Sequence, residues 1–230
     1  MIFFKKNVRK ISFEKVGQPG NEHNRKSDQS LNILNLDCLN GDNWLDDTVI
    51  NTYLELLMKK NKDVFSFTTF FFEAFTSGGF DRVKTWHEKQ NILSYAKILI
   101  PIHINGNHWF LISFDKKKLS SYDPYTFQDS DSEEAKLLLG RQNNDCLTKI
   151  LSSIREDYLK PLFNHFGKTW IDIEIEIKSP PTIPRQENGY DCGVFLLAFA
   201  KYLVFEKNFD FTTNDMQNMR NTIKLSLIHI

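Results

Sequence analysis

The amino-acid sequence predicts an α+β domain, in which helices flank a central sheet. Two strand-like runs, Lys97–Ile104 and His108–Phe114, are separated by the turn residues Asn105–Asn107, which is the pattern of an antiparallel hairpin. Helical patterns lie before and after these strands, at residues 43–57 and 194–205. Strands that are bracketed by helices at both ends indicate the α+β class.

The chain of 230 residues is long enough for one well-buried domain and short for two. Near its start, Ile11–Val16 reads as a short strand, and residues 17–30 are polar and rich in turn residues. We therefore expect residues 1–30 to form an N-terminal strand and a flexible loop. Residues 31–230 are expected to form a single folded domain.

The first helix is predicted from Asn43 to Leu57, because acidic residues crowd its first turn and apolar residues recur at spacings of three and four. These apolar residues are Val49, Ile50, Tyr53, Leu54, Leu56 and Leu57. A Phe-rich stretch, Phe65–Phe75, follows and ends at Ser77-Gly78-Gly79.

The middle of the chain continues the sheet. The run Leu119–Asp123 returns after a turn at Asp115–Lys118, which makes a three-stranded meander with the two strands before it. Residues 126–145 read as a charged loop containing some helix, and Leu147–Phe166 as a helix. Strict alternation over Ile171–Ile177 predicts a strand with one face in water.

Two helices are predicted to close the domain. Residues Val194–Phe205 are apolar nearly all round, which suits a buried helix. An amphipathic pattern runs from Asp215 to about Ile228.

Composition and charge exclude several classes of protein. The chain carries 29 basic and 29 acidic side chains, so no net field attracts nucleic acid or an anionic membrane. No segment has 18 consecutive apolar residues, and we expect no transmembrane helix. The charges near the N-terminus follow its apolar residues, an order that does not suit a secretory signal. We expect a monomer with no nucleic-acid or membrane partner.

The three cysteines, Cys38, Cys146 and Cys192, are odd in number and widely spaced. Neither a disulfide framework nor a zinc site fits this spacing. We therefore expect no metal, and a reducing compartment inside the cell.

Cys192 is the strongest candidate for a nucleophile. All three cysteines follow an aspartate, but only Cys192 precedes a glycine and a long apolar helix. Its sulfur is therefore predicted at or near a helix N-terminus, where the partial positive charge of unpaired amides favours the thiolate that cysteine catalysis requires. Taken alone, a cysteine in this position is more often a buried, inert residue.

His108 is the best candidate for the base among six histidines, because it begins a strand, and sheets often present catalytic groups. His103, on the preceding strand, is a weaker rival. His23 lies in the N-terminal loop and His229 at the end of the chain.

The hairpin geometry predicts Asp123 as the partner of His108. If Asp115–Lys118 forms the turn, Asp123 lies opposite Phe110, on the face that also carries His108. Diagonal neighbours on one face are about 7–8 Å apart at the backbone, within reach of an imidazole and a carboxylate. The carboxylate would fix one ring nitrogen while the other faces the sulfur. Without Cys192 the pair would be an ordinary polar contact between strands.

Gln186, six residues before Cys192, can supply a donor to the oxyanion that forms when a thiolate attacks a carbonyl. The backbone amide of Cys192 would be the second donor. Asn188-Gly189 provides a turn that could fold the glutamine back over the sulfur. A lone glutamine in a loop is otherwise most often a surface residue without a catalytic role.

These residues resemble the Ulp/SENP family of SUMO-specific cysteine proteases. The resemblance is carried by the stretch from Gln186 to Gly193, with His108-Trp109 and Tyr122-Asp123 upstream. Trp44-Leu45-Asp46-Asp47 is similar to the family's Trp-Leu-Asn-Asp motif, and Thr69–Phe72 and Gly79–Trp86 match weaker features. The similarity extends from about Asn43 onwards.

The resemblance implies a papain-like cysteine protease domain over residues 31–230, with the nucleophile at a helix N-terminus and no cofactor. The implied catalytic residues are His108, Asp123, Cys192 and Gln186. The implied substrate-binding residues are Trp44, Asp47, Trp109 and Gly193.

Members of this family cut after a Gly-Gly terminus, and they either mature SUMO precursors or remove SUMO from lysines. The resemblance implies that Trp44 and Trp109 clasp the two glycines in a narrow tunnel, with Asp47 near the tail. Flat indole walls admit only residues without side chains, so such a tunnel would enforce glycine. The expected partners are SUMO or another ubiquitin-like protein and its conjugates, in the nucleus, the cytoplasm or both.

Two other classes of function stay open from the sequence. An acetyltransferase effector can use a similar Cys-His-Asp triad, and a non-catalytic module can bind the modifier without cutting it. Nothing in the sequence suggests a site for acetyl-coenzyme A, and an activity assay separates an enzyme from a binding module.

Overall fold

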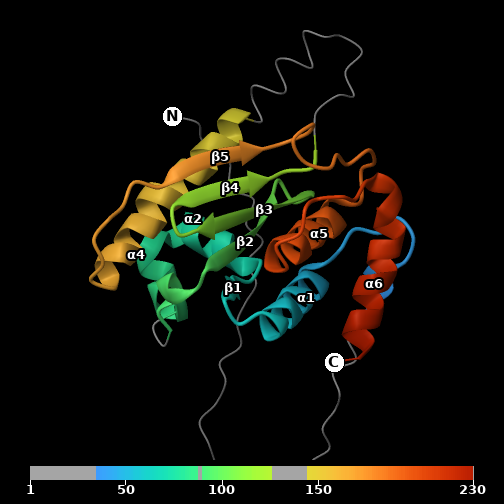
Figure 1. Cartoon of the computed structure of the whole chain (residues 1–230), viewed down its shortest axis with the longest axis horizontal. Helices are drawn as coiled ribbons and strands as arrows, with labels where there is room; N and C mark the ends of the chain where they lie inside the picture. Colours follow the sequence, from blue (N-terminus) through green and yellow to red (C-terminus); the bar gives the residue numbers. More distant parts are fainter. Residues whose placement is uncertain (1–34, 88–89, 126–143, 230) are drawn as a thin grey trace, which may run out of the picture. The chain divides into compact units, whose positions relative to one another are not determined.

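The computed structural model describes residues 35–87, 90–125 and 144–229 (Figure 1). In this part of the chain a five-stranded sheet has the order β1-β2-β3-β4-β5, so neighbours in space are also neighbours in sequence. The strands are β1 (Val64–Ser66), β2 (Lys97–Ile104), β3 (His108–Asp115), β4 (Lys118–Tyr122) and β5 (Glu174–Lys178). Helices flank this mixed sheet, which confirms the predicted α+β class.

The predicted meander is the centre of the sheet. Strands β2, β3 and β4 are antiparallel, whereas β1 and β5 run parallel to their neighbours at the two edges. The predicted register is confirmed, since Leu111 pairs with Tyr122. Asp115 and Lys118 already pair with each other, so the turn is one residue shorter at each side than expected.

The helices are α1 (Asp47–Lys60), α2 (Phe70–Val83), α4 (Lys160–His165), α5 (Cys192–Val204) and α6 (Met216–Ile228). Residues 144–153 are also α-helical and continue through a π-helical stretch, Ile154–Leu159, into α4. Short 3₁₀ turns occupy Asp37–Leu39, Lys84–His87, Ile92–Ser94 and Thr213–Asp215.

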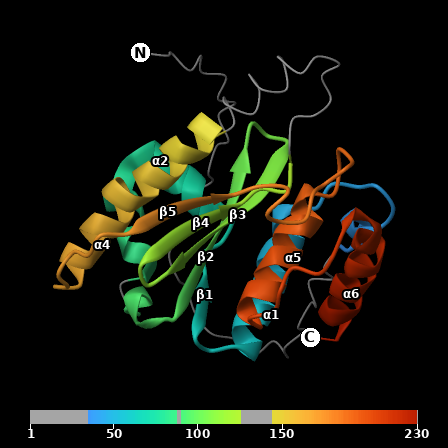
Figure 2. The same cartoon turned by 45° about the horizontal axis from the view of Figure 1, so that its top comes forward.

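The helices form two layers, one on each face of the sheet (Figures 1 and 2). Because side chains alternate along a strand, Leu99 and Leu111 belong to the core shared with α1, α5 and α6, whereas Ile98 and Ile112 belong to the core shared with α2 and the 144–165 helix. Each fully buried aliphatic or aromatic side chain of these cores contributes roughly 1.5–3 kcal/mol of hydrophobic stabilisation.

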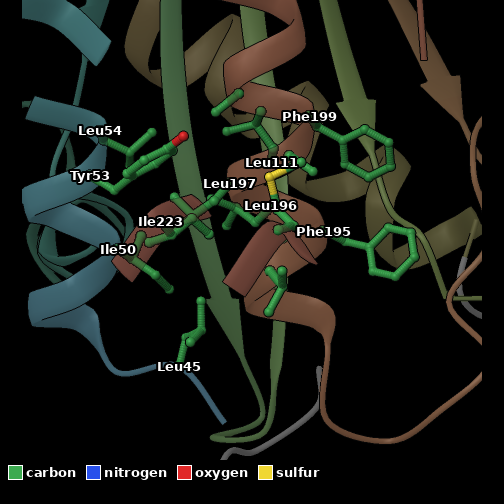
Figure 3. Close-up of a cluster of buried hydrophobic side chains, with 14 of the residues drawn as sticks. Leu45, Ile50, Tyr53, Leu54, Leu111, Phe195, Leu196, Leu197, Phe199 and Ile223 are labelled. Atoms are coloured by element: carbon green, nitrogen blue, oxygen red, sulfur yellow. The ribbon is translucent and has the colours of Figure 1, made fainter. Parts of the chain in front are cut away.

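Helix α5 lies between the sheet and helices α1 and α6, which explains why its sequence is apolar nearly all round. Figure 3 shows Leu196 and Leu197 of α5 among Tyr53 of α1, Leu111 of β3 and Ile223 of α6. The first residue of this buried helix is Cys192, so the core holds the backbone of the candidate nucleophile in place.

One helix boundary differs from the sequence prediction. Helix α1 begins at Asp47 and not at Asn43, because the side chain of Asp46 accepts a hydrogen bond from the backbone of Val49 (2.8 Å) and so caps the helix. Trp44 and Leu45 therefore precede the helix. Helix α2 continues past Gly78 to Val83, with a kink at Gly79, whose φ of 66° is one that glycine adopts without strain.

Some predicted segments lie outside the described residues, namely Ile11–Val16, residues 17–30 and residues 126–143. Residues 144 and 145, expected in the charged loop, already belong to a helix. The division at residue 30 stays a prediction. No helix in the described ranges combines the length and apolar character that crossing a membrane requires.

Candidate active site

The hairpin brings His108 and Asp123 together. His108 begins β3 and Asp123 directly follows β4, so the Leu111–Tyr122 pairing places the two residues diagonally. The His108 Nε2 atom lies 2.9 Å from Oδ1 of Asp123. The contact that strand parity predicts is therefore present, while its catalytic role stays a prediction.

Backbone donors and strand pairing hold Asp123 in place. Its side chain is 1% exposed, and a buried carboxylate needs hydrogen bonds to offset the loss of water. The backbone amide of Tyr125 donates to the same Oδ1 atom (3.0 Å). The backbone amide of Asp123 donates to the carbonyl of Lys178 on β5 (3.3 Å). These two hydrogen bonds orient Asp123 independently of its contact with His108.

Cys192 comes to this pair from a distant part of the sequence. It is the first residue of α5 and is 3% exposed. The preceding Asp191 makes no side-chain hydrogen bond to the helix amides, so their partial positive charge is not neutralised by a cap. Cys192 lies close enough to His108 to act on the pKa of the imidazole, so the three predicted residues lie together as one group.

The pKa of His108 reflects this arrangement. Burial disfavours the charged imidazolium and acts to lower the pKa, but hydrogen bonds and charge interactions with Asp123 and Cys192 outweigh burial and raise the pKa to about 9. His108 is therefore protonated at neutral pH while its partners are in place. An imidazolium beside a sulfur is the arrangement in which cysteine nucleophiles are activated.

The predicted oxyanion donor, Gln186, lies next to the end of β4. Its backbone amide donates to the carbonyl of Pro124 (2.8 Å), directly after Asp123. Gln186 is 3% exposed, and its Nε2 atom donates to the carbonyl of Asn188. The predicted placement of this amide over the Cys192 sulfur stays a prediction. An amide nitrogen carries two hydrogens, so the second one is available for a substrate oxygen.

The predicted substrate residues differ in burial. Trp109 is 7% exposed and its ring stacks on His103, with centroids 4.1 Å apart. Trp44 is 52% exposed and stands just before α1. Asp47 is half-buried at the start of α1, close enough for its charge to act on His103.

Gly193 is buried against Leu45, the neighbour of Trp44. A Cβ atom at residue 193 would lie 2.9 Å from Leu45 Cβ, closer than real Cβ contacts. This close approach explains the glycine by packing alone, and its predicted part in substrate binding stays a prediction. It also brings the Trp44 segment against the first turn of α5.

His103 packs against the indole of Trp109. Burial lowers the pKa of His103 and the neighbouring His108 lowers it further, against the opposing charges of Asp47 and Glu73. A neutral imidazole at 20° to the Trp109 ring is a stacking partner. Sequence reasoning placed His103 only as a weaker rival to His108.

Sequence reasoning missed Arg220. It is 1% exposed on α6, and it donates two hydrogen bonds to Oδ1 of Asp191, the residue before Cys192, at 3.0 and 2.7 Å. The signal was present, since Arg220 interrupts the apolar face of the predicted C-terminal helix between Met219 and Ile223. A charged residue on an apolar face is buried only when it is paired.

The described part of the chain contains no metal-binding cluster and no disulfide bond. No group of three or more His, Cys, Asp or Glu residues there is arranged to hold a metal ion. Cys38, Cys146 and Cys192 are all free thiols.

The sequence matches known proteins over most of its length. The family described as the Ulp1 protease family, C-terminal catalytic domain, matches residues 43–229. Sentrin-specific protease 3 of Mus musculus is 31% identical over 200 residues, covering 86% of this chain and 32% of that protein. Sentrin-specific protease 5 of Homo sapiens is 32% identical over 194 residues, covering 84% of this chain and 23% of that protein. The chain thus spans a third or less of the length of these relatives.

Solved structures show the same fold. The C-terminal Ulp1 protease domain in complex with Smt3, the yeast ortholog of SUMO, superimposes with a TM-score of 0.68 at 26% identity. The match covers 84% of this chain and 80% of that one. A Ulp1 SUMO protease whose catalytic cysteine is oxidized to a sulfonic acid matches with the same TM-score at 25% identity.

Proposed function

The chain belongs to the Ulp1 protease family, and we propose that it is a thiol protease and isopeptidase that cleaves after the C-terminal Gly-Gly of SUMO or a related ubiquitin-like modifier. The observation that carries this proposal is the contiguous group of Cys192, His108 and Asp123. The group combines a nucleophile at a helix N-terminus, an imidazole beside it and a buried carboxylate that orients the imidazole.

The first half of the reaction transfers the modifier to the enzyme. The Cys192 thiolate attacks the carbonyl carbon of the terminal glycine, and the His108 imidazolium gives its proton to the leaving amine. The C–N bond breaks, which leaves a thioester on Cys192 and a free amine. Asp123 stabilises the imidazolium and keeps its ring in line with the sulfur.

The second half releases the modifier. A water molecule attacks the thioester while the now neutral His108 takes one of its protons, the C–S bond breaks, and Cys192 leaves as a thiolate beside a reformed imidazolium. In both halves a negative oxygen develops on the glycine carbonyl. The side-chain amide of Gln186 and the backbone amide of Cys192 are the proposed donors to it.

The substrate tail is proposed to pass between Trp44 and Trp109. Trp109 is fixed by burial and by its stacking on His103, whereas Trp44 is about half exposed. One fixed wall and one exposed wall suit a flat, extended Gly-Gly segment. Asp47 would lie near the tail at the start of α1.

SUMO is the modifier favoured by the relatives. The similar proteins are named sentrin-specific proteases, and a structural neighbour of 26% identity is bound to Smt3, the yeast ortholog of SUMO. We place the activity on conjugates in the nucleus or the cytoplasm, which the three free thiols support.

The test is a panel of modifiers that carry an electrophile at the C-terminal glycine. We expect the SUMO probe to label Cys192 at least tenfold faster than the ubiquitin probe, and Cys192→Ala to remain unlabelled. Failure of every probe, with Cys192 still reactive towards iodoacetamide, would contradict a modifier substrate. Cleavage of a SUMO precursor and of a lysine-linked SUMO conjugate, compared side by side, separates maturation from deconjugation.

A further inference from the structure

A buried guanidinium is hydrogen-bonded to the loop that carries the candidate oxyanion donor. Arg220 points inward from the apolar face of α6 and is 1% exposed. Its Nε and Nη2 atoms donate to Oδ1 of Asp191, Nη1 donates to the carbonyl of Cys38 (3.0 Å), and Nη2 also reaches the carbonyl of Tyr190 (3.4 Å). The planar fork of arginine makes these contacts at once, which a lysine ammonium cannot do.

Asp191 links Arg220 to Asn188 through its two carboxylate oxygens. With Oδ1 on Arg220, its second oxygen, Oδ2, accepts a hydrogen bond from Nδ2 of Asn188 (2.7 Å). Asp191 occupies the N-cap position of α5, yet its side chain does not cap the helix. The carboxylate is instead held between the arginine and the asparagine.

Asn188 connects this pair to Gln186. Its side-chain oxygen accepts hydrogen bonds from the backbone amides of Tyr190 and Asp191, at 3.1 and 3.0 Å. Its backbone carbonyl accepts the hydrogen bond from Nε2 of Gln186. A continuous series of contacts therefore runs from Arg220 through Asp191 and Asn188 to the amide proposed to bind the oxyanion.

We propose that Arg220 is a positioning residue for catalysis, which through Asp191 and Asn188 holds the Gln186 amide in the orientation that binds the oxyanion. This inference rests on the proposed function. A donor works in an oxyanion site only when its direction is fixed before the reaction, and a shift of about 1 Å can cost about a hundredfold in rate. Arg220 supplies that fixation from outside the loop that bears the donor.

The test is a double-mutant cycle on the turnover of a SUMO–Gly-Gly amide. Gln186→Ala alone should lower kcat about a hundredfold. Arg220→Met should lower kcat at least tenfold, with KM within twofold of wild type. Arg220→Lys should lower kcat to a smaller degree. In the Gln186→Ala background, loss of Arg220 should cost less than a further twofold, since the donor that it orients is already gone.

A second readout separates positioning from a merely structural role. Alkylation of Cys192 by iodoacetamide forms no acyl oxyanion, so its rate should stay within twofold of wild type in Arg220→Lys. Lys224→Met, on the same helix and bonded to Asn40, serves as the control and should leave turnover unchanged. If Arg220→Met fails to fold, Asn188→Ala breaks the same series of contacts while the Arg220–Asp191 pair remains intact.

The outcomes are distinguishable. Additive losses in the Gln186→Ala background, or alkylation that falls in parallel with turnover, would overturn the positioning role and leave the proposed function standing. Wild-type protein without turnover on any modifier substrate would overturn both.

Discussion

Asp123 lies diagonal to His108 across the β3–β4 hairpin, with its carboxylate 2.9 Å from the imidazole. The two residues share one face of the sheet because the hairpin turn consists of two residues, Lys116 and Lys117. A turn with one residue more would shift the register and send one of the two side chains to the opposite face. The contact between His108 and Asp123 therefore depends on the length of a turn at the other end of the hairpin.

The first prediction concerns the nucleophile. Cys192→Ala and Cys192→Ser should abolish cleavage while the fold and modifier binding persist, because a small side chain fills the same buried space without supplying a thiolate. Turnover by purified variants is the measurement, with Cys38→Ser and Cys146→Ser expected to stay active. More than a few per cent of wild-type turnover in Cys192→Ala would refute the assignment.

The second prediction concerns Asp123. Asp123→Asn keeps the shape of the side chain but loses the charge that orients and stabilises the His108 imidazolium. We expect kcat to fall much more than affinity, and less than in His108→Ala, because a Cys–His pair can act in part without its third member. Steady-state kinetics of both variants test this. Wild-type activity in Asp123→Asn would mean that another residue orients His108.

The third prediction concerns pH. The pKa of His108 in the folded protein, about 9, exceeds the ordinary value of 6.5, so the folded state binds this proton more tightly than the unfolded state. The resulting stabilisation is full below about pH 6.5 and is lost as the pH rises through about 9. Activity should fall over the same alkaline range, because the imidazolium is the proton donor.

The measurement for this third prediction is an NMR titration of His108, followed in wild type and in Asp123→Asn. The variant removes a negative charge that raises the pKa of His108 and leaves burial, which lowers it, so the midpoint should move to lower pH. An unchanged midpoint would show that Asp123 does not raise the pKa of His108.

The fourth prediction concerns the substrate tail. Gly-Gly, Ala-Gly and Gly-Ala tails on the same modifier should bind alike but differ in kcat, since a methyl group must push Trp44 or Trp109 aside and misplace the scissile bond. Rates for the three tails, with wild type and Trp109→Ala, provide the test. Similar rates on all three would rule out the tunnel. If Trp109→Ala loses activity on Gly-Gly without tolerating alanine, Trp109 positions the tail but does not select it.

The fifth prediction concerns Gly193. Gly193→Ala would place a methyl group 2.9 Å from Cβ and 3.3 Å from Cγ of Leu45, an overpacking that costs about 1–3 kcal/mol. We expect a lower free energy of unfolding and lower kcat, because the first turn of α5 also carries Cys192. Combining it with Leu45→Gly, which removes both of these Leu45 atoms, should destabilise by less than the sum of the two single effects, as measured by denaturant titration. Strict additivity would argue against the contact.

Much of the site could be predicted because it follows from local rules. Strand parity predicts the His108–Asp123 contact from turn length alone. The apolar run after Gly193 predicts a buried helix, and hence the place of Cys192.

Other features depend on long-range packing, which periodicity does not encode. The parallel pairing of β1 with β2 and of β5 with β4 joins segments distant in sequence. The capping by Asp46 overrides the apparent helical pattern that includes Trp44. The hydrogen bonds of Arg220 to Asp191 form only when α6 packs against the loop before α5, although the position of Arg220 on an apolar face was already unusual.

The proposed triad joins His108 and Asp123, which are close in sequence, to Cys192, which lies in a distant segment. This separation affects how the site assembles. His108 and Asp123 are 15 residues apart, so bringing them together closes a small loop at low entropic cost. Asp191, beside the nucleophile, is bound by Arg220, which follows it by 29 residues and also bonds Cys38, 182 residues away. Contacts between such distant segments form late in folding. Where these contacts are the weaker part of a fold, they also open first. A chain whose C-terminal helix is not yet docked would therefore contain the His108–Asp123 contact while Cys192 is not yet held in place. The proposed protease activity should then require the whole domain to be folded.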